Sequence, residues 1–326
     1  MGGDKPPTIL ILGLKNYLEK NPTQANRFVL YVTNEIASML ESILDKYKVE
    51  MRKCENFINV HDEATIMKKK PNSTLVVALK EVRENKITTL ISVSNTKAYI
   101  TTAAVFLNKL FPDAKITLAS TLPKKDGGEF FFLDAGARVN YQAEDFVSLA
   151  AYGIEAARIL FNIKTPSVRL INVGSEKGKG DKLHVDADEL LHTKYPINYH
   201  GNLEPYLFMA HNDDVVLADG FSGNILAKGF EGGVQLMTIL IKNLAKKNLM
   251  NKLALLVLKS KIKKELFRYD YRSKGSAFIF GFEKILFKAH GRSDPLSIEN
   301  SIKTATQIIE SKFIDKLKGN WKNKNE

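Results

Sequence analysis

Closely spaced glycines and polar side chains mark the stretch from Asp213 to Gly233 as a place for ligand chemistry. Val215 to Ala218 form a short apolar run typical of a buried strand, and Asp219-Gly220 ends it abruptly. Helical spacing of apolar residues resumes at Ile225. A strand that turns on glycine into a helix presents backbone N–H groups that suit an anion such as phosphate. The pattern indicates either an anion site or a plain strand–turn–helix connection.

Three consecutive polar residues, Ser94, Asn95 and Thr96, stand between a predicted strand and a predicted helix. Their side chains are good helix N-caps, and they are equally able to hydrogen-bond a phosphate. Both interpretations remain open from the sequence.

A glycine-rich turn runs from Gly174 to Asp181. It is one residue short of a Walker loop and has Gly180 where the hydroxyl residue belongs. It also fails the dinucleotide fingerprint, because Leu183 takes the final glycine position. Lys177 and Lys179 can hold a phosphate or a developing oxyanion, or they belong to a solvated loop.

A second charged turn, Lys288-Ala-His290-Gly-Arg-Ser293, follows a predicted strand. His290 is a candidate acid–base group or phosphate ligand. A lone histidine before a turn also occurs for purely structural reasons, and the sequence does not separate these roles.

The segment from Leu236 to Arg268 is both basic and apolar, with Glu265 as its single acid. A basic helix with a broad apolar face can lie on an anionic membrane surface. It can also be a core or dimer-interface helix with a solvated basic side. We expect the membrane contact, if made, to involve Leu253, Leu256, Val257 and Lys261.

The composition favours an anionic partner, since 48 Lys and Arg face 36 acidic residues and leave a formal net charge of +12. Cys54 is the only cysteine, which excludes an internal disulfide and fits a reducing cytosol. No signal peptide is visible, and no apolar run approaches the roughly twenty residues of a spanning helix. The histidines form no HExxH pair, so we expect no metal site.

Alternating strands and helices predict a mostly parallel, doubly wound α/β sheet in a single catalytic domain, residues 1–326, with a basic helical excursion at about 236–270. The strands are expected at Arg27–Val32, Phe57–Val60, Thr88–Val93, Lys115–Ala119, Glu129–Leu133, Val168–Val173, Val215–Ala218 and Lys284–Phe287. The helices are expected at Thr8–Leu18, Asn34–Tyr47, Thr74–Asn85, Thr96–Leu110, Ala143–Phe161 and Pro295–Phe313. Two more are expected, one that follows Asp181 and ends at about His192 and one that begins after Gly220. The lysine-rich tail is expected to fray.

Taken in order, these motifs resemble the bacterial phosphate acyltransferase PlsX family. They are Met1-Gly-Gly-Asp4, Ser94-Asn-Thr96, Leu133-Asp-Ala-Gly-Ala137, Asn172 to Asp181, Gly201-Asn202, Asp219-Gly-Phe-Ser-Gly-Asn224 with Lys228, Glu231-Gly232, and Ala289-His-Gly-Arg-Ser293. The sequence departs from the family in several places: no strand precedes Met1, Ser92-Val-Ser-Asn-Thr-Lys97 lacks two glycines, Asp181 replaces an asparagine, and Pro205 replaces a glycine.

The resemblance implies a three-layer α/β/α fold like that of phosphotransacetylases and isopropylmalate dehydrogenases, and a homodimer. It also implies the reaction of acyl-[acyl carrier protein] with inorganic phosphate to give acyl-phosphate and free carrier protein, for phospholipid synthesis. No cofactor is implied, since phosphate is itself a competent nucleophile.

On this basis we assign phosphate binding to two turns, and catalysis to four side chains. The turns supply Asn95, Thr96, Gly220, Ser222, Gly223 and Asn224. Lys179 would stabilise the oxyanion, while Asp4, Asp219 and His290 would orient groups or relay a proton.

The expected location is the cytoplasm with peripheral membrane association, next to a membrane glycerol-3-phosphate acyltransferase that consumes the product. The acidic carrier protein is a natural partner for the basic surface. Two alternatives remain, acyl transfer from acyl-CoA and a non-catalytic basic nucleic-acid-binding protein. The second is disfavoured because no nucleic-acid motif is present.

Overall fold

The structure is a computed structural model that describes residues 2–44, 46–59, 61–63, 65–193, 197–269 and 271–322. Parts of three sequence expectations lie outside the described residues. They are the motif residue Met1, the end of the predicted strand at Val60, and the tail residues 323–326, which were expected to fray.

An eight-stranded sheet forms the centre of the described chain. In spatial order its strands are β3 (Leu90–Ser92), β10 (Leu286–Ala289), β9 (Ser276–Phe280), β4 (Thr117–Pro123), β5 (Glu129–Leu133), β8 (Val215–Leu217), β6 (Ser167–Ile171) and β7 (Asn198–Leu203). Four neighbouring pairs are parallel, and the three antiparallel pairs all involve β4 or β9. The expected mostly parallel sheet is confirmed.

Strand β5 shows why the fold has three layers. Phe131 and Leu133 point to one face of the sheet, where they join a core with α5 (Ala143–Leu160), α6 (Lys182–Thr193) and α11 (Phe313–Lys322). Phe130 and Phe132 point to the other face and pack with Phe208 and the start of α7 (Gly220–Lys247). Because successive side chains of a strand alternate, the four apolar residues from Phe130 to Leu133 need cover on both faces.

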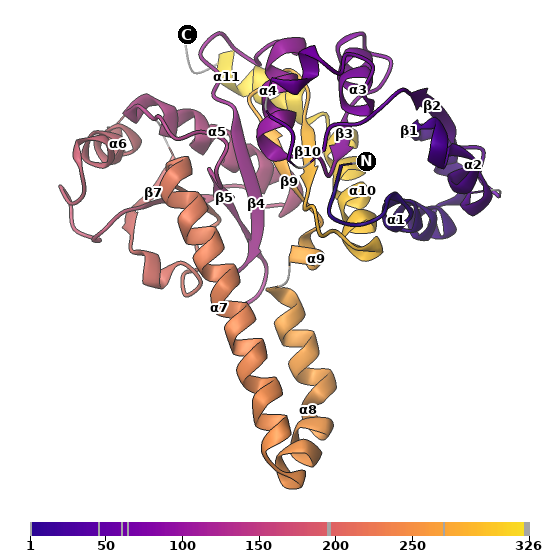
Figure 1. The fold of residues 1–326 in the computed structure, drawn as a ribbon. Helices are drawn as coiled ribbons and strands as arrows, with labels where there is room; N and C mark the ends of the chain where they lie inside the picture. The colour runs from indigo at the N-terminus through magenta and orange to yellow at the C-terminus, as the bar shows by residue number, and fades with distance from the viewer. Residues whose placement is uncertain are drawn as a thin grey trace.

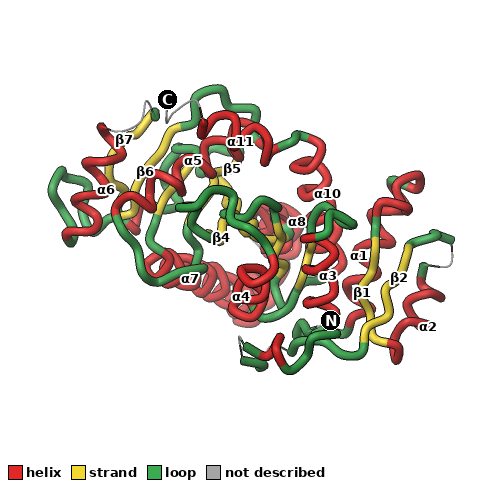
Figure 2. The backbone as a smooth tube through the Cα atoms, turned by 90° about the horizontal axis from the view of Figure 1, so that it is seen from above, coloured by secondary structure: helices red, strands yellow, loops and turns green. Residues whose placement is uncertain are grey.

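The remaining helices surround this sheet and a smaller one. They are α1 (Pro7–Lys20), α2 (Asn34–Ile43), α3 (Thr74–Arg83), α4 (Thr96–Phe106), α8 (Leu249–Arg268), α9 (Tyr271–Lys274) and α10 (Pro295–Glu310), with short 3-10 turns at Pro22–Arg27, Ile66–Lys68 and Pro205–Leu207. The smaller sheet pairs β1 (Val29–Thr33) with β2 (Glu50–Cys54) in parallel. It lies with α2 at one end of the molecule, and β7 and α6 lie at the other (Figure 2).

A largely apolar cavity of about 480 Å³ lies between the small sheet and the edge of the large one. Its walls include Leu30 of β1, Leu90 of β3, Leu10 of α1 and Ile302 of α10. The described strands β1 and β3 therefore face each other across open space without pairing.

Helices α7 and α8 form a hairpin that extends away from the body of the molecule (Figure 1). Asn248 joins them and caps α8, since its side-chain oxygen accepts the N–H of Asn251 at 2.7 Å. No described helix combines the length and apolar character needed to span a membrane.

Several sequence expectations need correction. The strand predicted at Phe57–Val60 is wrong: the strand is β2, and the described part of the predicted stretch is a loop whose Ile58 is buried in a core with α3 and α4. Burial alone explains that apolar run. The expected helices Asn34–Tyr47 and Thr96–Leu110 end earlier, at Ile43 and Phe106, and strands β7 and β9 were not predicted.

Candidate active site

The start of α7 is closed by its own cap. One carboxylate oxygen of Asp219, Oδ1, accepts the backbone N–H groups of Phe221 and Ser222 at 3.0 Å each. The N–H of Gly223 donates to the carbonyl of Asp219 at 2.8 Å. These three donors, which the sequence offered to a phosphate, are satisfied within the chain.

The two glycines of this turn, Gly220 and Gly223, allow another segment of the same chain to pack closely against the start of α7. A β-carbon at Gly220 would lie 2.0 Å from the carbonyl oxygen of Arg138, and one at Gly223 would lie 2.0 Å from that of Asp134. The absent side chains of these glycines thus make room for the Asp134–Arg138 turn, and their part in phosphate binding stays a prediction. Asn224 also packs there, against Gly136.

Asp134 holds that turn together from the inside. It is fully buried at the end of β5, and its carboxylate accepts backbone N–H groups of Leu118, Gly136, Ala137 and Arg138 as well as the hydroxyl of Tyr141. Burial raises its pKa, and these hydrogen bonds oppose the rise.

His184, in the first turn of α6, was not among the residues predicted from the sequence. Its Nδ1 lies 2.6 Å from the carboxylate of Asp181, and its Nε2 lies 3.5 Å from Oδ2 of Asp219. The Asp219 carboxylate beside Nε2 raises the pKa of His184, although burial favours a lower value. Burial favours a higher pKa for the Asp219 carboxyl group, but His184 and Ser222 stabilise the carboxylate, and the pKa is well below its usual range. We call Asp134, Asp181, His184 and Asp219 the Asp219 group.

The glycine-rich loop beside this group is anchored by amide side chains. The buried Asn172 donates to the carbonyl of Lys179 at 2.9 Å and to Asn202 at 3.2 Å, and it lies under Gly180, which has φ of +95°. The Lys179 residue is exposed, and its aliphatic stem packs near Gly174. The loop is thus folded on Asn172 and presents its lysines to solvent.

A second set of polar residues gathers where β10 ends. The N–H of Asp4 donates to the carbonyl of Gly291 at 2.9 Å, and the Asp4 carboxylate lies against the same glycine. Nδ1 of His290 accepts the N–H of Arg292 at 3.1 Å, which leaves the hydrogen of a neutral ring on Nε2. We call Asp4, Lys288, His290 and Arg292 the Asp4 group.

This group is cationic and open to solvent. Burial lowers the pKa of Lys288 to about 8, and Asp4 opposes the change. Burial, followed by the charges of Lys288 and Arg292, lowers the pKa of His290. Asp4, His290 and Arg292 are exposed, so an anion can reach them from water.

Helix α7 adds two charges to the Asp4 group. Glu231 lies in the electrostatic field of Arg292 and Lys228, which oppose the rise in its pKa caused by desolvation. Lys228 and Glu231 were quoted in the resemblance but not predicted as site residues. Their spacing of three along a helix was a usable signal, because it places both on one face.

The topology separates the residues that we expected to share one phosphate. Asn95 and Thr96 follow β3, which is parallel to β10, so they belong to the edge of the Asp4 group. Three antiparallel pairs lie between β10 and β5, and β5 is parallel to β8. The turn at Gly220–Asn224 therefore follows a strand that runs in the direction opposite to β3 and β10. At the start of α4, Asn95 acts as the expected cap, accepting the N–H of Ala98 at 3.2 Å.

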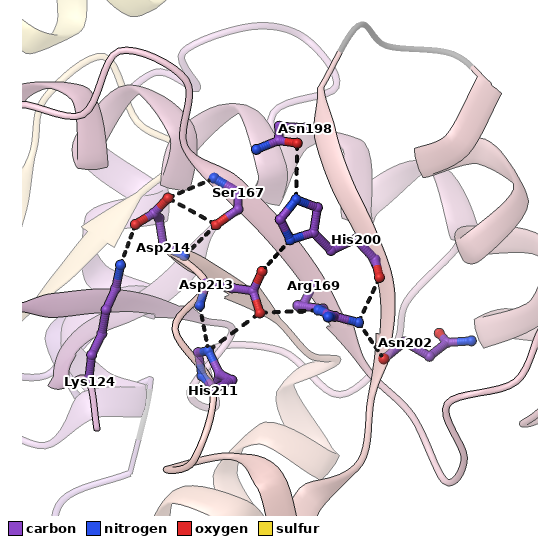
Figure 3. A network of polar contacts seen from close by, with 9 residues as sticks. All are labelled: Lys124, Ser167, Arg169, Asn198, His200, Asn202, His211, Asp213 and Asp214. Atoms are coloured by element: carbon purple, nitrogen blue, oxygen red, sulfur yellow. Dashed lines mark hydrogen bonds and ion pairs between the residues drawn. The ribbon is translucent and has the colours of Figure 1, made fainter. Parts of the chain in front are cut away.

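A further polar network lies at the amino ends of β6 and β8 (Figure 3). Asp213 contacts Arg169 at 3.1 Å and His200 at 2.6 Å, and Asp214 accepts from Ser167 and pairs with Lys124. The network ties strands β6, β7 and β8 to the end of β4, which is a structural role.

The residues expected at a membrane are exposed on α8. Leu253, Leu256 and Val257 expose 56%, 53% and 79% of their surface, and Lys261 is also exposed. Within the described ranges, no three His, Cys, Asp or Glu side chains converge as metal ligands.

The chain matches the model of a family described as "Fatty acid synthesis protein" over residues 1–316. It is 33% identical over 319 residues to the phosphate acyltransferase of Exiguobacterium sp. (strain ATCC BAA-1283 / AT1b), with 98% of this chain and 96% of that protein covered. The chain belongs to the PlsX phosphate acyltransferase family. The phosphate acyltransferase of Fervidobacterium nodosum is also 33% identical, over 321 residues, with 97% and 95% covered.

Solved structures share the fold of this PlsX-family chain. A branched-chain phosphotransacylase from Enterococcus faecalis V583 superposes with a TM-score of 0.58 at 14% identity, with 94% of this chain and 96% of the other covered. A phosphotransacetylase from Streptococcus pyogenes gives 0.54 at 14% identity, with 91% and 99% covered. At this identity the likeness establishes the α/β architecture alone.

Proposed function

We propose that this acyltransferase moves an acyl group from acyl-[acyl carrier protein] to inorganic phosphate, giving acyl-phosphate and free carrier protein. Family membership supports the reaction type. The observation that carries the placement of the phosphate is the cluster of half-buried Lys288 with exposed His290 and Arg292, beside Glu231 and Lys228 of α7.

The chemistry asks little of the protein beyond charge and position. A phosphate oxygen attacks the thioester carbonyl carbon, a C–O bond forms, the C–S bond breaks, and the sulfur leaves as a thiolate that takes up a proton. Arg292 offers a planar fork of donors that suits phosphate, and Lys288 adds a second cation. Asn95 and Thr96 at the start of α4 supply hydrogen bonds and a helix N-terminus on the same edge.

The assignments from the sequence divide accordingly. Asp4, His290, Asn95 and Thr96 belong to the proposed phosphate site. The residues Asp219, Gly220, Ser222, Gly223 and Asn224 hold the base of α7, and Lys179 is proposed to act from the glycine-rich loop on the incoming substrate.

The hairpin is proposed to contact other macromolecules. Its exposed apolar side chains, beside Lys252, Lys259, Lys261 and Lys263, suit an anionic membrane surface or a second copy of the chain. Association with a membrane would deliver acyl-phosphate to a membrane glycerol-3-phosphate acyltransferase, as part of phosphatidic acid synthesis. The basic charge also suits an acidic carrier protein.

The direct test is to incubate the purified chain with palmitoyl-[acyl carrier protein] and phosphate and to follow acyl-phosphate. Product that depends on phosphate is expected. Product from palmitoyl-CoA alone would favour the phosphotransacetylase-like alternative. The absence of product from both donors would contradict the assignment.

A further inference from the structure

The imidazole of His184 lies between two carboxylates that come from different elements. Asp181 ends the glycine-rich loop and also accepts the backbone N–H of His184 at 3.0 Å. Asp219 begins α7. The His184 side chain is 14% exposed and that of Asp219 is 9% exposed, whereas that of Asp181 is 67% exposed. The ring is thus an internal link between a surface loop and a helix.

The second carboxylate oxygen of Asp219 depends on this link. Oδ1 is used in capping α7, while Oδ2 is buried without a short hydrogen bond among the described residues. The Asp134 carboxylate is close by, since a β-carbon at Gly220 would lie 2.8 Å from its Oδ2. A buried anion beside another buried carboxyl group needs a cation, and His184 is placed to supply it.

We propose that His184 is a positioning residue for catalysis: with a proton on each ring nitrogen, it ties the loop that carries Lys177 and Lys179 to the base of α7. The inference rests on the proposed acyl transfer to phosphate. Through α7 the tie also sets Lys228 and Glu231, which lie about 14 and 18 Å further along the helix, where Glu231 is in the electrostatic field of Arg292. One contact therefore acts on both the glycine-rich loop and these charges of α7.

Protonation decides whether the tie is complete. Among the described residues, the charged groups that face the ring are Asp181 from the loop and Asp219 from α7. From α5 the apolar ring of Phe146 packs against it, with 5.9 Å between the ring centroids. Both carboxylates favour the imidazolium, so the doubly protonated ring persists above the ordinary pKa of histidine. As the pH rises through that raised pKa, one of the two donors is lost.

Two isosteric variants separate the two halves of the contact. His184→Gln places an amide nitrogen near the position of Nε2 and keeps a donor toward Asp219. His184→Asn places one near Nδ1 and keeps a donor toward Asp181. Neither amide titrates, so the one contact that each variant keeps does not depend on pH.

The experiment measures kcat and KM for phosphate between pH 6 and 9 with palmitoyl-[acyl carrier protein]. For His184→Gln we expect kcat/KM within about threefold of wild type near pH 6.5 and a weaker decline at alkaline pH. For His184→Asn we expect a loss of roughly tenfold or more at every pH, because the base of α7 is released. The alkaline decline caused by Lys288 is common to all three proteins.

Equal kcat/KM values and equal pH profiles for the three proteins would overturn the proposal. Hydrogen exchange gives a readout that does not need activity: the amides of Phe221 and Ser222, which Asp219 caps, should exchange faster in His184→Asn than in His184→Gln. Faster exchange of these amides in an enzyme without acyl-phosphate formation would reject the proposed function and retain the tie. Active protein with unchanged exchange would reject the tie and retain the function.

Discussion

Gly223 lies directly against the main chain of Asp134, so that a β-carbon at this glycine would be only 2.0 Å from the Asp134 carbonyl oxygen. The carbonyl belongs to a rigid backbone, and it cannot move aside as a flexible side chain would. The spacing of Asp219, Gly220 and Gly223 therefore reflects the locking of one βα turn into another.

Substitution at this contact should be costly, and α7 supplies a matched control. Gly223→Ala is expected to destabilise the fold by about 2–4 kcal/mol or to displace the Asp134 turn. Gly229→Ala, with nothing within 4 Å of the added carbon, should stabilise the helix by about 0.5–1 kcal/mol. Chemical denaturation of both variants checks this, and equal effects would contradict the packing argument.

Arg292 and Lys179 lie in different groups, and their substitutions should differ in kind. Arg292→Ala should lower kcat/KM by about a hundredfold, mainly through KM for phosphate, with Arg292→Lys recovering only part of it. Lys179→Ala should lower turnover by about a hundredfold if its charge serves the oxyanion. Steady-state kinetics with varied phosphate separate the two, and an unchanged rate for Lys179→Ala would remove it from the mechanism.

The Asp4 carboxylate should set the alkaline limit of phosphate binding. It raises the pKa of Lys288, which burial has lowered to about 8. Asp4→Asn should therefore move the increase in KM for phosphate to lower pH by roughly one unit, whereas Asp4→Glu should keep the wild-type profile. A profile of KM against pH measures this. Identical profiles for the wild type and Asp4→Asn would exclude Lys288 as a phosphate partner.

His211 should make the fold sensitive to acid. Burial lowers its pKa in the folded state, so its contribution to stability is present above the unfolded pKa of about 6.5 and is lost as the pH falls. His211→Asn keeps an acceptor for the N–H of Asp213 but cannot bind the proton. The free energy of unfolding of wild type minus that of the variant should fall by at most about 1.4 kcal/mol per pH unit below 6.5. A difference that does not depend on pH would contradict this prediction. His184, whose pKa is raised, contributes stability that is lost as the pH rises, which is the opposite sign.

The hairpin should determine membrane binding independently of catalysis. Replacing Leu253, Leu256 and Val257 together with serine should weaken binding to anionic liposomes by roughly tenfold or more. Phosphate-dependent turnover in solution should stay unchanged, because these side chains lie far along the hairpin from the Asp4 group. Cosedimentation is the measurement, and persistent binding would show that the segment is structural.

The sequence predicted the parts of the fold that local patterns determine. Glu129–Leu133 was predicted with its correct bounds because a continuous apolar run between turns identifies a strand buried on both faces. Strand β2, with the sequence Glu-Met-Arg-Lys-Cys, was missed because its polar residues resemble a loop. The strand was predicted instead at the nearby apolar stretch that contains the buried Ile58. β7, which contains Gly201 and alternates weakly, was missed for a similar reason.

The candidate site was only partly predictable, since its arrangement depends on strand direction. The chain order of motifs identified Asp4, Asn95, Asp219 and His290, but it could not show that β9 and β4 reverse the sheet between them. His184 was missed because Asp219, its partner from α7, is distant in the sequence and comes close only through the pairing of β6 with β8, while its other partner, Asp181, is a local i,i+3 contact.

Helix α7 runs without interruption from its Asp219 cap to Lys247, a length of about 42 Å. Its first turn is clamped by His184 and Asp134, its middle faces Arg292, and its far end carries the apolar hairpin tip. The first turn is therefore the fixed end of a long helix. If a membrane or another chain docked on the tip and tilted α7 about this end, Lys228 and Glu231 would shift relative to the proposed phosphate site, and turnover would depend on what the tip contacts.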